Sequence, residues 1–295
     1  MTVRGDVGAN LLIGPSGAKS AGRDRARPLR DGCAAKPDFT NRHAQVAGVD
    51  LGSRTTKVVV MQDDRIVGSA LTDTGPDMTA RALRLLEPYH PARIAATGYG
   101  RHLAAASFAH DVITEITAYA LGARRLFPDC RTVIDVGGQD SKAISLDEQG
   151  GFRDFEMNDR CAAGTGRFLE IMARALGFSV ESFGQAALEA DHPVSVSSVC
   201  TVFAETEVIS LIAQDENPRN IALGLHHAIA DRLVAMVTRV GARPQVVFAG
   251  GVAHNPCIVR LLGKRLRVEI LVPQEPQLVG ALGAALHAAG GESPS

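Results

Sequence analysis

Two segments of the sequence repeat one arrangement, in which an aspartate ends an expected strand, a glycine turn follows, and the next strand carries a lysine. Asp50 and Lys57 belong to the first segment, and Asp135 and Lys142 belong to the second. Glycine lets a turn approach a ligand closely, and the N–H groups of such a turn attract anions. Two turns of this kind facing each other across a cleft would clamp the phosphates of a nucleotide, and their carboxylates would hold Mg²⁺ through water.

The side chains of these two turns suggest distinct roles in nucleotide hydrolysis. We expect Asp50 and Asp135 to bind Mg²⁺ and order water, and Gln139 and Asp140 to orient the attacking water. The remaining candidate phosphate ligands are Gly52, Ser53, Arg54, Thr55 and Lys57 in the first turn, and Gly137, Gly138 and Lys142 in the second. Each lysine either brings positive charge to the phosphates or is a solvated residue of its strand.

A third glycine turn follows the expected strand 245–249. It contains Gly250, Gly251 and Val252 and leads into an expected helix, so it could lie against the nucleoside. A single glycine hairpin is usually only a hairpin. The three turns together favour a nucleotide site.

Two of the five cysteines, Cys161 and Cys200, stand directly before expected helices. The N-terminus of a helix lowers the pKa of a thiol and so favours the thiolate, which is the form that binds metal. Two thiolates cannot complete a four-coordinate site, so a metal centre would need a second chain, and a twofold dimer would supply four cysteines. The alternative is a pair of ordinary buried cysteines. We expect Cys33, Cys130 and Cys257 to be incidental.

The expected elements that would position these residues occur in the same order twice, which indicates an α/β fold of two lobes with mixed sheets. The expected strands are 46–51, 55–61, 65–71, 93–97, 131–136, 141–146, 151–156 and 245–249, and the expected helices are 78–86, 116–127, 163–176, 204–213, 217–240, 256–266 and 277–289. We expect residues 46–129 to form the first lobe, with the helix at 276–289 packing back on it, and residues 130–275 to form the second.

Composition excludes several classes of function. The chain has 31 basic and 32 acidic residues, 4% aromatic residues and no tryptophan, which argues against binding to nucleic acid or to a membrane surface. No stretch of 18 residues is apolar enough to predict a membrane-spanning helix. Residues 1–45 carry eight Arg or Lys against four Asp and show no sustained period, so we expect a disordered tail.

The sequence from Val46 to Ala288 resembles the ATP-dependent activators of 2-hydroxyacyl-CoA dehydratases and the related ATPase subunits of benzoyl-CoA reductase. The segments that carry the resemblance are VDLGSRTTK, ATGYGR, VIDVGGQDSK, MNDRCAAGTGRFLE, SSVCTVFAETEVIS, FAGGVAHN and GALGAAL. The resemblance implies a two-lobed actin-like ATPase of the superfamily that includes heat-shock chaperones and sugar kinases, with a duplicated ribonuclease-H-like fold and mixed β-sheets flanked by helices. The three turns then correspond to the phosphate-1, phosphate-2 and adenosine motifs, and 115–123 and 277–286 to the connecting helices.

The same resemblance implies a function and its cofactors. It implies a homodimer with one [4Fe–4S] cluster shared between subunits, with Cys161 and Cys200 as its ligands. ATP with Mg²⁺ would drive a single electron from ferredoxin or flavodoxin to an iron–sulfur acyl-CoA dehydratase or reductase, in a cytoplasmic, oxygen-poor setting. Glu205 either links the nucleotide and cluster regions or is an acid stabilised by its helix dipole. The chain departs from the family at Arg54, where small residues are common, and in its longer tail.

The sequence leaves three alternatives open. The chain could be the ATPase subunit of a benzoyl-CoA-type reductase, paired with a related second subunit. It could be a cluster-free sugar or acyl kinase of the same fold, but such a kinase would have no use for the two cysteine segments. A nucleotide-gated protein of the chaperone or actin type ranks last, because no substrate-binding domain or polymer-forming insertion is evident.

Overall fold

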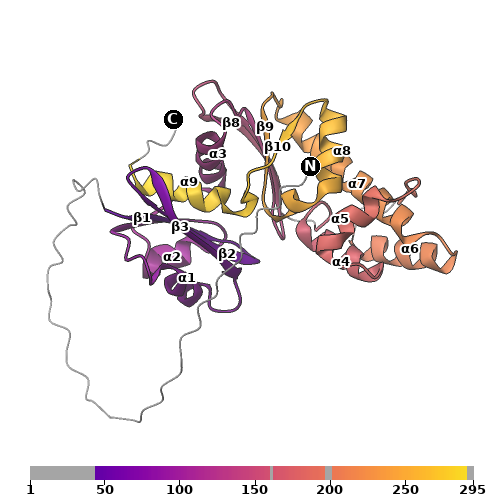
Figure 1. The fold of residues 1–295 in the computed structure, drawn as a ribbon, viewed down its shortest axis with the longest axis horizontal. Helices are drawn as coiled ribbons and strands as arrows, with labels where there is room; N and C mark the ends of the chain where they lie inside the picture. The colour runs from indigo at the N-terminus through magenta and orange to yellow at the C-terminus, as the bar shows by residue number, and fades with distance from the viewer. Residues whose placement is uncertain (1–43, 160–161, 197–200, 291–295) are drawn as a thin grey trace, which may run out of the picture. The chain divides into compact units, whose positions relative to one another are not determined.

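The computed structural model describes residues 44–159, 162–196 and 201–290, and these residues form two five-stranded sheets (Figure 1). The first sheet contains β1 (Val46–Leu51), β2 (Thr55–Gln62), β3 (Arg65–Asp73), β4 (Arg93–Thr97) and β5 (Asp111–Val112). The second contains β6 (Thr132–Val136), β7 (Ser141–Leu146), β8 (Phe152–Asn158), β9 (Val246–Ala249) and β10 (Ile270–Leu271). The expected tail falls almost entirely outside the described residues.

Both sheets have the same topology. The strand order is β3-β2-β1-β4-β5 in the first sheet and β8-β7-β6-β9-β10 in the second. In each sheet, three consecutive strands pair antiparallel, and the other two run parallel to the first of them. This repeated order confirms the expected duplicated α/β fold with mixed sheets.

Helices cover both faces of the first sheet, which explains why the centre of β2 is a continuous valine run. Helices α1 (Met78–Leu86) and α2 (Arg101–Ser107) lie on one face, where Ala82 and Ala104 join a core with Val58 and Val60. Helix α9 (Val279–Ala288) covers the other face, where Val59 packs with alanines and leucines of the helix.

The second sheet is also covered on both faces. Helix α3 (Glu115–Leu126) packs on one face, where Tyr119 and Ala123 meet Ile144 of β7. The largest core lies on the other face and contains residues of α4 (Gly166–Ala175), α5 (Val180–Leu188), α6 (Thr201–Ala213), α7 (Pro218–Arg239) and α8 (Pro256–Leu266). Helix α3 contacts strands of the second sheet and also contacts α9, so its contacts do not assign it to the first lobe alone. The expected lobe boundary at residue 129 therefore stays a prediction.

Helices α3 and α9 approach each other backbone to backbone. A Cβ added at Gly283 would lie 1.7 Å from the carbonyl oxygen of Ala118, and one added at Gly122 would lie 2.1 Å from that of Val279. Glycine is therefore required at both positions, because any side chain would force the two helices apart.

Several element boundaries differ from the sequence-based expectation. The helix expected at 163–176 begins at Gly166, because the N–H of Thr165 bonds to the carbonyl of Ala162 and closes a turn first. Helices α2 and α5 were not predicted, and neither were β5 and β10, whose two residues are too few to show a period. Helix α7 is long and apolar enough by composition to cross a membrane. However, 56% of its apolar 18-residue stretch is buried inside the protein, which is the pattern of a core helix.

Candidate nucleotide site

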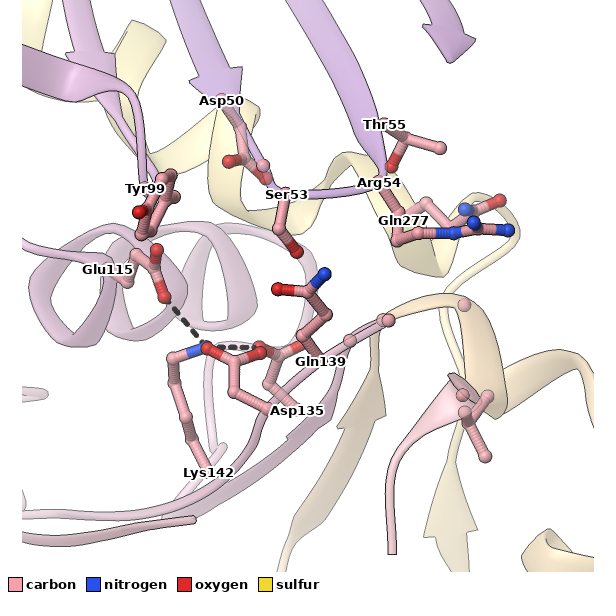
Figure 2. A pocket seen from close by; sticks show the side chains of 18 of the residues that line it. Asp50, Ser53, Arg54, Thr55, Tyr99, Glu115, Asp135, Gln139, Lys142 and Gln277 are labelled. Carbon is pink, nitrogen blue, oxygen red and sulfur yellow. Dashed lines mark hydrogen bonds and ion pairs between the residues drawn. The ribbon is translucent and has the colours of Figure 1, made fainter. Parts of the chain in front are cut away.

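A cavity of about 1180 Å³ lies where the turns of the two sheets face each other. Figure 2 shows Asp50, Ser53 and Arg54 along one wall, and Asp135 and Lys142 along the opposite wall. The predicted residues that line the cavity are Asp50, Gly52, Ser53, Arg54, Thr55, Lys57, Asp135, Gly137, Gly138, Gln139, Asp140, Lys142, Gly250, Gly251 and Val252. The three glycine turns therefore meet at one site.

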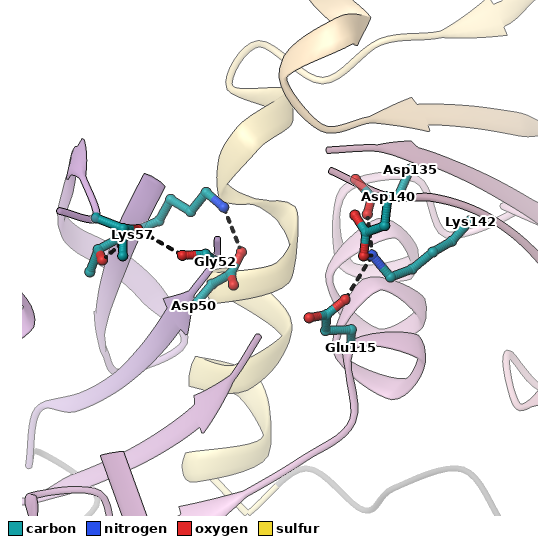
Figure 3. Close-up of polar contacts among 9 residues, drawn as sticks. Asp50, Gly52, Lys57, Glu115, Asp135, Asp140 and Lys142 are labelled. Atoms are coloured by element: carbon teal, nitrogen blue, oxygen red, sulfur yellow. Dashed lines mark hydrogen bonds and ion pairs between the residues drawn. The ribbon is translucent and has the colours of Figure 1, made fainter. Parts of the chain in front are cut away.

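The two aspartate–lysine segments form equivalent hairpins. Asp50 lies opposite Lys57 in the β1–β2 pair, and Asp135 lies opposite Lys142 in the β6–β7 pair. Side chains on directly opposite residues share a face of the sheet, so each lysine reaches its aspartate. The distances from Nζ to Oδ2 are 2.9 Å in the first hairpin and 3.2 Å in the second (Figure 3).

Lys142 holds three carboxylates together. Besides Asp135, its Nζ lies 2.6 Å from Asp140 Oδ2 and 2.7 Å from Glu115 Oε2, on α3. The lysine is only 2% exposed, and Lys57 is only 9% exposed, so neither is the solvated strand residue that the sequence left open. Three carboxylates around one ammonium give this floor of the cavity an excess of negative charge, which suits a bound cation.

Burial and neighbouring charges shift the pKa values of this group. Burial raises the pKa of Asp135 to about 6, against the attraction of Lys142, and the charges of Asp140 and Glu115 add to the rise. Burial opposes the charge of Lys142, but its three carboxylates outweigh that effect and raise its pKa above the usual range. Burial, together with Asp135, raises the pKa of Tyr119. The lysine thus stays charged, while Asp135 loses its proton only at about pH 6.

The oxygen atoms on this floor fit a magnesium ion. Asp135 Oδ1 is buried without a hydrogen-bond partner, although carboxylate oxygens are ligands that Mg²⁺ prefers. Among the described residues, no group of three or more His, Cys, Asp or Glu side chains is arranged so that it could hold a metal ion by itself. Phosphate and water would therefore have to supply most of the coordination shell, as is usual for Mg²⁺ beside a nucleotide.

The third turn closes directly on the second hairpin. Gly250 has a φ of +84°, and a Cβ there would lie 2.6 Å from Asp135 Oδ1 and 2.4 Å from the carbonyl oxygen of Val136. Only glycine fits this approach. The helix expected directly after the glycines is preceded by a short 3-10 turn, η1 (Gly251–His254), and α8 follows it.

The cavity is also lined by residues that were not predicted as site residues, and three of them lie beside the predicted turns. Glu115 is the first residue of α3, whose N-cap is Thr114, and Tyr119 lies one turn further along the helix. Gln277 lies in the 3-10 turn η2 (Pro276–Leu278), and its amide nitrogen would lie 3.4 Å from a Cβ at Gly251. An acid in the first turn of a helix usually needs no explanation beyond the helix dipole, so the sequence alone gave no reason to select Glu115.

Glu205 does not lie with the other predicted residues. It is exposed on α6, and it is not among the residues that line the cavity. The reason is the orientation of α6, which buries Ala204 and Val208 and therefore turns the intervening Glu205 outward. The structure thus leaves the predicted contact of Glu205 with the nucleotide without geometric support.

The two cysteines predicted to bind a cluster, Cys161 and Cys200, lie outside the described residues. Cys161 precedes the turn that leads to Gly166, so α4 begins five residues after it and not directly after it as expected. The helices that follow the two cysteines, α4 and α6, pack against each other. Cys130 and Cys257 are buried, and burial raises the pKa of each thiol to about 11, which agrees with an incidental role. Cys33 is also outside the described residues.

A model of the BadF/BadG/BcrA/BcrD ATPase family matches residues 47–288. The chain belongs to this family. It is 41% identical over 251 residues to the 2-hydroxyisocaproyl-CoA dehydratase activator of Clostridioides difficile, an alignment that covers 82% of this chain and 93% of that protein. It is 40% identical over 250 residues to the (R)-2-hydroxyglutaryl-CoA dehydratase activating ATPase of Acidaminococcus fermentans, covering 82% and 95%. The expected family resemblance is confirmed.

Solved structures of this family share the fold. The crystal structure of component A of the A. fermentans dehydratase superposes with a TM-score of 0.79 at 38% identity, covering 84% of this chain and 98% of that one. The C. difficile activator with bound ADPNP superposes with a TM-score of 0.78 at 40% identity, covering 83% and 94%. A Streptomyces griseus glucokinase, at 16% identity and a TM-score of 0.56, shares the fold alone. This chain is therefore an ATP-binding member of an actin-like ATPase family.

Proposed function

We propose that this chain is an ATP-hydrolysing iron–sulfur activator that drives low-potential single electrons to a 2-hydroxyacyl-CoA dehydratase. One observation carries the proposal. The N–H groups of Gly166 and Arg167, which begin α4, donate to the carbonyl oxygens of Gly137 and Gly138 at 2.9 Å each. The proposed phosphate-2 turn is thus bonded directly to the helix that follows Cys161. A nucleotide that moves this turn would therefore also move the start of the helix next to the cysteine segment.

The nucleotide side of the proposal rests on the floor of the cavity. Asp50 and Asp135 would hold Mg²⁺ and order water, and Lys57 and Lys142 would keep these carboxylates in position. Gln139 and Asp140 would orient the attacking water, and Glu115 faces the same ammonium as Asp140. Because the carboxylates are in excess there, the triphosphate would bind together with its cation.

The redox side of the proposal assigns Cys161 and Cys200 as ligands of a [4Fe–4S] cluster shared by two copies of the chain. Bound, such a cluster would accept and release one electron. Close to Cys200 in the sequence, α6 exposes two apolar residues, Val202 and Phe203, which are 69% and 66% exposed. Apolar side chains so exposed would be covered in a homodimer. Ferredoxin or flavodoxin would supply the electron, in the cytoplasm.

Metal analysis after strictly anaerobic purification tests this proposal. We expect about two iron and two sulfide per chain in a dimer, in wild type and in the control variant Cys130→Ala, which removes a buried thiol beside the second sheet. Cys161→Ala and Cys200→Ala should each lose the iron and retain ADPNP binding. Iron-free wild type with intact ATPase activity would instead favour the cluster-free kinase.

A second candidate is the ATPase component of a benzoyl-CoA-type reductase. The chain is 36% identical over 203 residues to one of the subunits of the benzoyl-CoA reductase of Thauera aromatica, covering 66% of this chain and 71% of that protein. Such a component would pair with a related partner. A chain that forms an iron-containing homodimer by itself would argue against this candidate, and one that stays monomeric and iron-free until a related partner is added would favour it.

A further inference from the structure

Arg54 spans the cavity from the first sheet to the second. It lies in the turn between β1 and β2, and its Nη2 is 3.0 Å from Oε1 of Glu170 on α4, 116 residues away in sequence. Its side-chain methylenes pass over Gly138, where an added Cβ would lie 2.3 Å from Arg54 Cγ. The side chains of Arg54 and Glu170 are 50% and 28% exposed, so solvent and ligands reach this ion pair.

Helix α4 therefore contacts the phosphate-binding turns of both sheets. Its first two N–H groups bond to Gly137 and Gly138, and Glu170, in its second turn, bonds to Arg54. A change in either turn acts on α4 without an intermediate element.

Glu170 has a second cationic partner, and this partner is on its own helix. Arg167 Nη1 lies 3.0 Å from Glu170 Oε2, the oxygen that Arg54 does not contact. Partial burial opposes its ionisation, but the hydrogen bond from Arg167 and the charge of Arg54 hold the pKa of Glu170 below its usual range. The carboxylate therefore remains ionised and partnered when Arg54 leaves it, so the release of Arg54 costs little.

A terminal phosphate offers Arg54 a stronger partner than Glu170. Guanidinium groups bind phosphate with two parallel charge-assisted hydrogen bonds, whereas an exposed ion pair such as Arg54–Glu170 contributes little. We infer that Arg54 exchanges Glu170 for the terminal phosphate of a bound triphosphate, so that it distinguishes triphosphate from diphosphate and breaks the contact between the β1–β2 turn and α4 when the triphosphate is present. This inference rests on the nucleotide position that the proposed function assigns, between the turns at Asp50 and Asp135.

Equilibrium binding of Mg²⁺-ADPNP and Mg²⁺-ADP to the full chain tests the exchange. We expect Arg54→Ala to weaken ADPNP binding about tenfold and to change ADP binding by less than about twofold. Glu170→Gln removes the competing carboxylate and should strengthen ADPNP binding about 2- to 5-fold, the range of an exposed ion pair. This gain should vanish in the double variant, because Arg54 is then absent. The matched control is Arg125→Ala, which breaks an exposed 3.2 Å ion pair with Asp64 outside the cavity and should change neither affinity.

Amide hydrogen exchange of residues 162–175 supplies a readout that does not depend on activity. In wild type, the exchange rate of this segment should differ between the ADPNP-bound and the ADP-bound chain. In Arg54→Ala, the two nucleotides should give the same exchange rate. Two results would overturn the inference and leave the proposed function standing. One is an equal loss of affinity for ADPNP and ADP in Arg54→Ala, and the other is a gain in ADPNP affinity from Glu170→Gln that persists without Arg54. Wild type that binds ADPNP at a site unaffected by Asp50→Asn and Asp135→Asn would overturn both. A chain that shows the selectivity but no iron would retain this inference and overturn the cluster alone.

Discussion

Lys142 lies opposite Asp135 in the β6–β7 hairpin, and its ammonium nitrogen is 3.2 Å from Asp135 Oδ2. Asp140 and Glu115 contact the same nitrogen, so one buried cation joins the β6 and β7 strands, the turn between them and the start of α3. The chemistry of the cavity floor thus depends on whether Lys142 remains in place.

Replacing this lysine should destabilise the fold. We expect Lys142→Met to lower the free energy of unfolding by about 3–5 kcal/mol, because it leaves a buried carboxylate without its counter-charge. Urea denaturation at pH 7 measures the loss. Arg125→Ala, which breaks an exposed pair, should lose no more than about 1 kcal/mol. A loss that small in Lys142→Met would show that the buried pair does not stabilise the fold.

Magnesium-dependent binding should follow the titration of Asp135. Its pKa is raised from 3.8 to about 6, so the folded chain holds the proton more tightly than the unfolded chain, and the contribution of Asp135 to stability falls as pH rises through that window. Mg²⁺ competes with the same proton. Affinity for Mg²⁺-ADPNP should therefore rise with pH up to about 6, at most about tenfold per unit, and then level off.

The control for this titration is Asp135→Asn. The nucleotide's own phosphate titrates in the same pH range, so the ratio of wild-type to variant affinity isolates the aspartate. A ratio that stays constant from pH 5 to pH 8 would contradict the assignment of Asp135 as a cation ligand.

His226 should make the fold sensitive to acid. It is fully buried, its Nδ1 bonds to the carbonyl of Ala222 at 2.7 Å, and its Nε2 accepts from the amide of Asn255 at 3.0 Å. Burial lowers its pKa from 6.5 to about 4, so its neutral form contributes stability above pH 6.5 that is lost as pH falls toward 4, on the order of 3 kcal/mol. The unfolding free energy of His226→Gln should vary less over this range, and that of His102→Gln, an exposed site, should follow wild type.

The contact between α3 and α9 should tolerate no side chain at Gly283. Gly283→Ala places a methyl group 1.7 Å from the carbonyl oxygen of Ala118, so the helices must separate, at a cost of about 3 kcal/mol in unfolding free energy. At Gly263 in α8, an added Cβ would come no closer than 3.3 Å to the Val268 carbonyl, and Gly263→Ala should stay within about 1 kcal/mol of wild type. Equal thermal stability of the two variants would mean that the crossing is not close.

The sequence predicted the parts of the site that local chemistry defines. The hairpins at Asp50 and Asp135 were recognised because strand patterns rich in β-branched residues, a glycine turn and an aspartate coincide within a few residues. The helices at Met78–Leu86 and Pro256–Leu266 have the expected limits, since each is bounded by residues that start or stop a helix, such as Asn255 before Pro256.

The sequence could not predict what depends on contacts between distant segments. Glu115 becomes a site residue only because α3 brings it within 2.7 Å of Lys142. That lysine can be buried with its charge because three carboxylates surround it, and one of them, Glu115, lies outside the hairpin that carries the lysine. Glu205 was placed near the nucleotide from its distance to Cys200 along the chain, but the orientation of α6 decides its position.

Helix α9 has a consequence for how the chain folds during synthesis. Its residues complete the cores around Val59 and Ala95 of the first sheet, although β1 to β5 precede it by more than 150 residues. Until the ribosome has released α9, that face of the sheet lacks its main cover, because of the other described α-helices only α3 contributes to the core there, through Ala118 and Leu121, and apolar side chains such as Val59 stay exposed to water. The second sheet, whose strands and covering helices all lie before residue 272, takes only Val279 of α9 into its core and can acquire the rest earlier. The first sheet, although it is synthesised first, is therefore the last to complete its core. Chaperones that bind apolar strands of nascent chains should bind this sheet until α9 is in place.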